Sequence, residues 1–175
     1  MLLYHGSSTS GIVTLRPSIS NHAKPFVYLT DCAALALLYA HNPIKRPGGF
    51  FPYYFDKAGL LHYEEYFCDQ TRKMYAEHSG WIYTAESVHF SRLDKMPWVY
   101  LSETDVSVSD ATFIPDIYAA LTAAEQDGQL IIHRYEDASV EQHKMNLQVV
   151  QKSLEGHANE DYVRFLREHM PEAFI

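Results

Sequence analysis

Residues 26–40 constrain the fold more than any other stretch, because a predicted strand runs directly into a predicted helix there. Side chains alternate along a strand, so Tyr28 and Thr30 share one face. The Ala/Leu-rich run that follows favours a helix, and Thr30 or Asp31 is expected to cap it by accepting a hydrogen bond from a backbone N–H. Tyr39 falls in the last turns of that helix. We therefore expect Tyr28 and Tyr39 to project into one cavity.

A second informative stretch is the sequence Leu-Leu-Tyr-His-Gly-Ser-Ser at residues 2–8. Its pattern predicts a short buried strand that ends in a polar turn. His5 and Gly6 come at the end of that strand. A glycine suits this place because the missing side chain lets a ligand approach the backbone closely. We expect this strand end to lie beside the cavity of the two tyrosines.

The remaining segments alternate between strand-like and helix-like patterns, with no internal repeat and no linker that divides the chain. Residues 12–15 fit either a helical turn or a strand. The other strands are predicted at 53–55, 81–84, 96–101 and 129–135, with a short piece around Val106 and Val108. Helices are predicted at 63–78, 115–127, 139–155 and from Asn159 onward. This mixture predicts one α+β domain over residues 1–175, with a helical C-terminal segment at about 139–175.

Two of these helices depend on specific local signals. Tyr63, Phe67 and Met74 recur at helical spacing, which predicts the amphipathic helix at 63–78. Ser139 opens a Ser-x-x-Gln capping box, which predicts the start of the next-to-last helix.

Charge and motifs exclude several functional classes. The formal net charge is −8, so non-specific binding to nucleic acid, which needs a basic face, is not expected. The ten histidines form no His-Glu-x-x-His or His-x-His pattern, so no metal ligands are predicted. No glycine-rich nucleotide loop, phosphate loop or nucleophile elbow occurs either.

The cysteines and the hydropathy of the sequence indicate the cellular compartment. The two cysteines, Cys32 and Cys68, are far apart and form no disulfide framework, which favours a reducing compartment. No basic region precedes a long apolar run, and no window reaches the length of a membrane span. We therefore expect a cytoplasmic protein without a membrane partner.

The two N-terminal stretches together resemble the His-Tyr-Glu branch of the ADP-ribosyltransferase superfamily, which contains the diphtheria-toxin-like enzymes and the poly(ADP-ribose) polymerases. The resemblance consists of Tyr-His-Gly-Ser at a strand end, then Tyr-x-Thr in a strand, then Ala-x-x-Tyr in a helix. It covers about the first quarter of the chain well and the rest loosely. It implies a split pair of mostly antiparallel sheets with flanking helices. NAD, the substrate, would lie in a cleft between the sheets.

The resemblance also implies roles for four residues. His5 would hydrogen-bond the ribose on the nicotinamide side of NAD, and the backbone of Gly6 would bind the carboxamide. Tyr28 and Tyr39 would stack on the nicotinamide ring. An aromatic sandwich of this kind holds a flat ring well and stabilises it while it is cationic.

A carboxylate is the remaining requirement, because breaking the nicotinamide–ribose bond builds positive charge on the ribose. In the resembling family this group is a glutamate on a later strand. The best match is Glu103, which follows Leu101-Ser102 and precedes the alternating Val106 and Val108. Glu86 is the main alternative, and Glu136 is a weaker one.

The expected activity is ADP-ribosyl transfer from NAD to an acceptor, or hydrolysis of NAD. The Glu-x-Glu and Gln-x-Glu pairs of the arginine-modifying branch are absent, so the acceptor stays open among proteins, nucleic acids and small molecules. One alternative is a catalytically silent module of the same fold that binds a nucleotide or a protein partner. Another is an unrelated α+β domain in which both tyrosines are core residues. The loop at 43–52, with Lys45 and Arg46, fits a surface loop or a flap near a pyrophosphate.

Overall fold

A computed structural model describes residues 1–19, 24–41, 52–86, 90–93, 96–157 and 160–175. Its backbone divides into two units, each made of two chain segments: Met1–Asn42 with Tyr75–Gln129, and Pro43–Met74 with Leu130–Ile175. The predicted α+β class is confirmed, with antiparallel sheets and several helices. The single domain over residues 1–175 stays a prediction. Lys45 and Arg46 lie outside the described residues.

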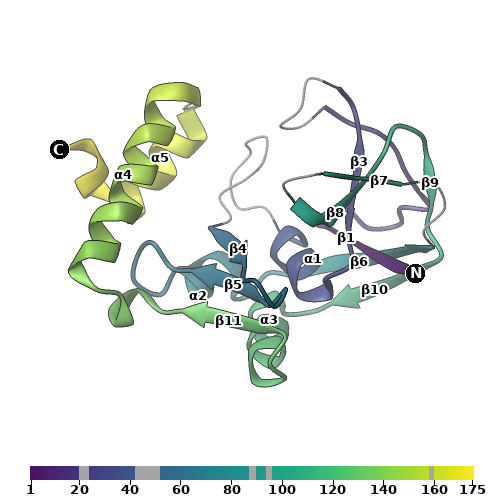
Figure 1. The fold of residues 1–175 in the computed structure, drawn as a ribbon, viewed down its shortest axis with the longest axis horizontal. Helices are drawn as coiled ribbons and strands as arrows, with labels where there is room; N and C mark the ends of the chain where they lie inside the picture. Colours follow the sequence, from purple (N-terminus) through teal and green to yellow (C-terminus); the bar gives the residue numbers. More distant parts are fainter. Residues whose placement is uncertain (20–23, 42–51, 87–89, 94–95, 158–159) are drawn as a thin grey trace. The chain divides into compact units, whose positions relative to one another are not determined.

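The first unit is built on a six-stranded antiparallel sheet with the strand order β10-β6-β1-β3-β8-β7 (Figure 1). Its strands are β1 (Leu2–Ser7), β3 (Val27–Thr30), β6 (Gly80–Glu86), β7 (Ser91–Leu93), β8 (Met96–Ser102) and β10 (Asp110–Ile114). A two-stranded sheet pairs β2 (Thr14–Leu15) with β9 (Val106–Ser107). The sequence did not predict β10, because its first four residues are all exposed and show no alternating burial.

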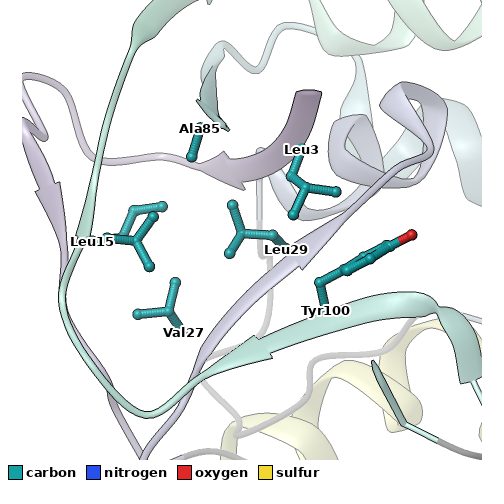
Figure 2. Close-up of a cluster of buried hydrophobic side chains, with 7 residues drawn as sticks. Leu3, Leu15, Val27, Leu29, Ala85 and Tyr100 are labelled. Carbon is teal, nitrogen blue, oxygen red and sulfur yellow. The ribbon is translucent and has the colours of Figure 1, made fainter. Parts of the chain in front are cut away.

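A buried apolar cluster covers one face of the large sheet (Figure 2). It joins side chains from β1, β2, β3, β6, β8 and β9 that alternate onto the same face, with Ile12, Phe90 and Val108 packed around them. The buried members are Leu3, Leu15, Val27, Leu29, Ala85, Tyr100 and Val106. Burial of large apolar side chains contributes about 1.5–3 kcal/mol each, so this cluster fixes the register of the strands.

Helix α1 (Ala33–Tyr39) packs on the opposite face of the same sheet, and two glycines make room for it. A Cβ on Gly6 would lie 1.9 Å from the carbonyl oxygen of Ala36, and a Cβ on Gly80 would lie 2.4 Å from that of Ala40. Both distances are far below van der Waals contact. The helix backbone therefore rests directly on β1 and β6. Helix α3 (Ile117–Gln126) packs against α1.

The start of α1 differs from the prediction in one respect. The N-cap residue is Cys32, and no side chain caps the helix. The hydroxyl oxygen of Thr30 accepts a hydrogen bond from the backbone N–H of Cys32 at 3.1 Å, one residue before the helix. Asp31 does not cap, because its carboxylate accepts a hydrogen bond from the hydroxyl of Tyr100 at 3.0 Å.

The second unit contains a three-stranded sheet with the order β11-β5-β4. Its strands are β4 (Tyr53–Phe55), β5 (Leu61–Glu64) and β11 (Leu130–His133). β5 runs antiparallel to β4 and parallel to β11. The helical elements are α2 (Gln70–Tyr75), which ends where the chain returns to the first unit, then η1 (Tyr135–Asp137), α4 (Val140–His157), α5 (Glu160–His169) and η2 (Pro171–Phe174).

The predicted helix at 63–78 is wrong in its first half, where β5 ends at Glu64 and α2 begins only at Gln70. Residues 61 and 63 are buried while 62 and 64 are partly exposed, which is the two-residue period of a strand. The buried carboxylate of Glu65 then accepts hydrogen bonds from the backbone N–H groups of Thr71 at 2.8 Å and Tyr135 at 3.3 Å. This bridge holds the start of α2 beside the segment after β11.

The predicted helical C-terminal segment is present, and the helix after Ser139 begins at the predicted cap. The hydroxyl oxygen of Ser139 accepts a hydrogen bond from the N–H of Gln142 at 3.1 Å, as expected of a capping box. The side chain of Gln142 does not complete the box, because its amide donates to the Asn146 side chain at 2.9 Å instead. Near the end of α4, the hydroxyls of Ser153 and Tyr162 are 2.7 Å apart, which ties this helix to α5.

Candidate functional site

Three strands bring the predicted site residues to one end of the large sheet. β1 ends at Ser7, the antiparallel neighbour β3 begins at Val27, and β8 ends at Ser102, which lies opposite Val27. We call this the Ser7 end of the sheet. His5, Tyr28 and the residue that follows β8, Glu103, all lie at or next to it. The antiparallel register, which the sequence alone does not specify, creates this convergence.

His5 is held by a hydrogen bond to the neighbouring strand. Its Nδ1 lies 2.9 Å from the carbonyl oxygen of Tyr28 on the neighbouring strand. A carbonyl oxygen can only accept, so Nδ1 carries the proton and Nε2 of the neutral ring has a free lone pair. Burial lowers the pKa of His5, and the bond to the Tyr28 carbonyl opposes this only in part. His5 is therefore a neutral imidazole at neutral pH, with Nε2 as an acceptor.

The two tyrosines share the face of the sheet that carries α1. Thr30 pairs with Tyr4, and Tyr28 and Gly6 lie two residues away on their strands, so they project to that same face. Tyr39 is the last residue of α1, and its backbone carbon would lie 2.9 Å from a Cβ on Gly6. Tyr28 is half-buried, whereas Tyr39 is 38% exposed. One face thus carries both predicted ring-stacking residues.

Gly6 has a structural role that the sequence did not reveal. The space over its Cα is filled by the backbone of α1, so a ligand does not occupy it. What remains available to a ligand at Gly6 is its backbone amide or carbonyl. The requirement for glycine at this position is already explained by the contact between β1 and α1.

The side chain of His5 projects to the other face of the sheet, because it alternates with Gly6. Its neighbours in register are Tyr83 on β6 and, on the same face of β1, the buried Leu3. The side chain of His5 therefore lies on the face opposite the two tyrosines, and its contact with Tyr28 is with the backbone carbonyl.

Glu103 lies in a bend directly after β8, whereas the corresponding glutamate of the resembling family lies on a strand. It is exposed, and the turn around it is held by Ser102, whose hydroxyl donates to the carbonyl of Thr104 at 2.8 Å. β1 and β8 flank β3, so Glu103 is displaced sideways from β1 by two strand spacings, or about 10 Å. It lies at the same end of the sheet as His5 and Tyr28.

The two rival carboxylates have different surroundings. Glu86 ends β6 opposite Leu2, which puts it at the other end of the sheet, about 13 Å along the strands from Gly6. Glu136 belongs to η1 in the second unit. It accepts a hydrogen bond from the thiol of Cys68 at 2.9 Å, and this bond lowers the pKa of Glu136 and raises the pKa of Cys68. Within the first unit, Glu103 is the better placed of the two candidates.

An aromatic pair at the Ser7 end was not singled out from the sequence. Trp81 lies opposite Ser7 on β6, and Phe113 lies opposite Trp81 on β10. Their ring centroids are 5.1 Å apart, and Phe113 is 50% exposed. Alternation puts this pair on the face of His5. The pair could not be predicted, because Phe113 belongs to the unpredicted strand β10.

Within the described ranges, no helix is both long and apolar enough to cross a bilayer. Cys32 and Cys68 are both free thiols. No family model matches the sequence, and no curated protein or solved structure matches it either.

Proposed function

We propose that the chain has an ADP-ribosyltransferase-like fold and uses NAD as its substrate, transferring ADP-ribose to an acceptor or to water. The observation that carries this proposal is the convergence of β1, β3 and β8 at the Ser7 end. It gathers His5, Tyr28 and Glu103 from three separate parts of the sequence. The end of α1 adds Tyr39 beside Gly6.

His5 would orient the ribose next to nicotinamide. The hydrogen bond to the Tyr28 carbonyl fixes the tautomer, and the free Nε2 lone pair accepts a hydrogen bond from a ribose hydroxyl. The backbone of Gly6 would bind the carboxamide. Burial keeps the His5 ring uncharged, which matters because an imidazolium beside a ribose that becomes positive would oppose the reaction.

Tyr28 and Tyr39 would hold the nicotinamide ring from the side of the sheet that carries α1. Burial raises the pKa of Tyr28, so its ring stays a neutral phenol at physiological pH. A neutral aromatic face stabilises the cationic nicotinamide of bound NAD through a cation–π interaction. The same face still stacks on neutral nicotinamide after the bond is broken.

Glu103 would stabilise the ribose in the transition state. The glycosidic bond between C1′ and the nicotinamide nitrogen breaks, and its electron pair leaves with nicotinamide. Positive charge then develops on C1′ and the ring oxygen, and the carboxylate beside the ribose hydroxyls lowers the energy of that charge. The acceptor atom, or water, forms the new bond to C1′ and loses its proton to solvent.

A second candidate function is a silent module of the same fold that binds NAD or another nucleotide. The exposed position of Glu103, in a bend beyond β8, favours it. An exposed carboxylate is screened by water and stabilises a developing charge less than one in an enclosed site.

Nicotinamide release from NAD by the purified chain tests the proposal. We expect release by the wild type, and Glu103→Gln should reduce the rate by roughly 10²- to 10³-fold, the usual effect of removing one electrostatic group. His5→Ala should also reduce it, because the ribose loses its acceptor. Glu86→Gln is the matched control, since Glu86 lies at the opposite end of the sheet, and it should turn over at the wild-type rate.

The outcomes separate the alternatives clearly. Loss of activity in Glu86→Gln with normal activity in Glu103→Gln would exclude the role of Glu103. NAD binding without nicotinamide release, in the presence of varied acceptors, would support the silent module. A chain that shows neither NAD binding nor nicotinamide release would contradict the proposal. Binding can be detected by the melting temperature, because saturating NAD should raise the melting temperature of any protein that binds it.

A further inference from the structure

The solvent-facing side of the three-stranded sheet in the second unit carries an aromatic and imidazole cluster. Tyr54 on β4 lies directly opposite His62 on β5, and His133 on β11 is diagonal to His62. The rings of Tyr54 and His62 are stacked, with centroids 4.7 Å apart and planes at 14°. The hydroxyl of Tyr54 lies 3.4 Å from Nε2 of His133. These side chains come from three strands, so the sheet itself brings them together.

The two histidines meet edge to edge, with a nitrogen of each directed at the other. Nδ1 of His62 and Nε2 of His133 are 2.8 Å apart, whereas the ring centroids are 5.1 Å apart and the planes differ by only 11°. One proton lies between these two nitrogens, because two lone pairs at this distance would repel each other. His41 and His78 in the first unit form a different arrangement, in which the ring faces stack with centroids 3.9 Å apart.

Asp56 lies on the far side of His62. Its Oδ2 is 3.5 Å from Nε2 of His62, the ring nitrogen that does not face His133. The other oxygen, Oδ1, accepts hydrogen bonds from the backbone N–H groups of Ala58 and Leu60, both at 2.9 Å, so the carboxylate is fixed in place. Among the described residues Nε2 of His62 has no hydrogen-bond partner, and Asp56 is the carboxylate beside it. A carboxylate that accepts the proton of the outer nitrogen is a common partner of metal-binding imidazoles, because it keeps the inner nitrogen free to coordinate.

We propose that Nδ1 of His62 and Nε2 of His133 are ligands of a divalent transition-metal ion such as Zn²⁺. Neutral imidazole is a preferred ligand of these ions, at about 2.0–2.1 Å for zinc, and two nitrogens about 3 Å apart can both reach one ion. His133 is exposed, so a small tilt of its ring makes room for an ion between its Nε2 and Nδ1 of His62. The proton between the two rings leaves its nitrogen on binding, and the same ring takes up a proton from solvent on its outer nitrogen, so both ligands stay neutral imidazoles. Water fills the remaining positions.

The surroundings favour a cation at this place. Glu64 lies opposite His133 in the sheet register, and Asp56 borders His62, so two carboxylates flank the imidazole pair. Tyr54 covers one face of His62 and limits its rotation. The site belongs wholly to the second unit, and it does not depend on the NAD chemistry proposed for the first.

A second group of possible ligands in the same unit makes a weaker site. Cys68, Asp69 and Glu136 have ligand atoms within 4.8 Å of one another, and all three are exposed. The Cys68 thiol already donates to Glu136, and a hydrogen-bonded thiol must lose its proton before it can coordinate. The Lys73 ammonium donates to the Cys68 carbonyl at 2.8 Å, so a positive charge stands next to the cluster.

Zinc titration of the full chain, purified without a histidine tag, tests the site. Binding of ZnCl₂ is measured by competition with a chromophoric chelator and by the melting temperature with and without EDTA. We expect one zinc per chain at the imidazole pair and a zinc-dependent rise in melting temperature. His133→Asn and His62→Gln should each weaken zinc binding at least tenfold. Asp56→Asn should weaken it roughly 10- to 100-fold, as is usual for groups that orient a metal ligand.

Two matched controls make the result decisive. His143→Asn removes a histidine of the same unit whose ring packs on Tyr135, and Cys68→Ser removes the thiol of the second group. Both variants should bind zinc like the wild type. Zinc binding that survives in His133→Asn, or that is lost in Cys68→Ser, would overturn the proposal. So would a wild-type chain whose melting temperature zinc does not change.

Discussion

At the scale of single residues, one hydrogen bond decides which atom of His5 is available to a ligand. The bond to the Tyr28 carbonyl fixes the proton on Nδ1, and burial keeps the ring neutral. The acceptor at Nε2 is therefore present at neutral pH without any change in the protonation of the ring. A histidine with the opposite tautomer would present a donor to the ribose instead.

The protonation of His5 can be measured directly by ¹⁵N NMR of the imidazole nitrogens. We expect a neutral ring with the proton on Nδ1 at pH 7, and a pKa below the ordinary value of about 6.5. Nicotinamide release should fall as the pH drops through that lowered pKa, because protonation turns Nε2 into a donor. A ring that is half-protonated above pH 6.5, or that carries its proton on Nε2, would contradict this tautomer.

At the scale of elements, helix α1 packs on two glycines of the sheet. This packing sets the position of the helix that carries Tyr39 relative to the strand that carries His5. The helix approaches so closely that its carbonyl oxygens stand where the side chains of residues 6 and 80 would begin. Any larger residue moves the helix, and Tyr39 moves with it. The position of Tyr39 thus depends on Gly6 and Gly80, because these glycines allow the backbone of α1 to lie on the sheet.

Gly6→Ala should both destabilise the first unit and impair any activity that uses Tyr39. Overpacking of this kind typically costs about 1–3 kcal/mol, and the contact here is with backbone, which cannot rotate away. Chemical denaturation measures the loss. Gly11→Asn is the control, because Gly11 has open space around it and a φ of 71° that asparagine tolerates. A Gly6→Ala variant as stable as Gly11→Asn would contradict the close packing.

Secondary structure was predicted correctly where signals within a few residues decide it, and incorrectly where pairing between distant segments decides it. The strand before α1 and the cap at Ser139 were both confirmed, although Gln142 does not complete the box, because alternation and capping act within a few residues. The second half of β5 was predicted as the start of a helix, since Tyr63 and Phe67 also fit a helical period and only the pairing with β4 and β11 decides. The histidine pair escaped prediction for the same reason, as its two members are 71 residues apart. The bend at Glu103 likewise depends on where β8 stops pairing with β3.

At the scale of the whole molecule, several histidines make the folded state sensitive to acid. Burial, together with the neighbouring His78, lowers the pKa of His41 to about 4. Burial also lowers the pKa values of His5 and His169. The unfolded chain, with histidine pKa values near 6.5, therefore binds more protons than the folded chain below that pH.

The free energy of unfolding should consequently decrease as the pH falls from about 6.5 toward 4, the window between the unfolded and folded pKa values of His41. His41→Phe keeps a flat ring on His78 but cannot bind a proton, so its stability should fall less over the same range. Urea denaturation at a series of pH values measures both curves. Parallel curves for the two proteins would show that His41 contributes nothing to the acid sensitivity.

The two-segment construction of each unit has a consequence for synthesis. β11 pairs in parallel with β5, yet nearly the whole middle of the chain separates Leu61 from Leu130. While the ribosome has made the chain only as far as Gln129, β5 has one neighbour and an open edge, and open strand edges are where nascent chains associate wrongly. The first unit, in contrast, already has all its strands at that moment. The nascent chain therefore passes through a stage in which the first unit can fold while the three-stranded sheet of the second unit still lacks β11.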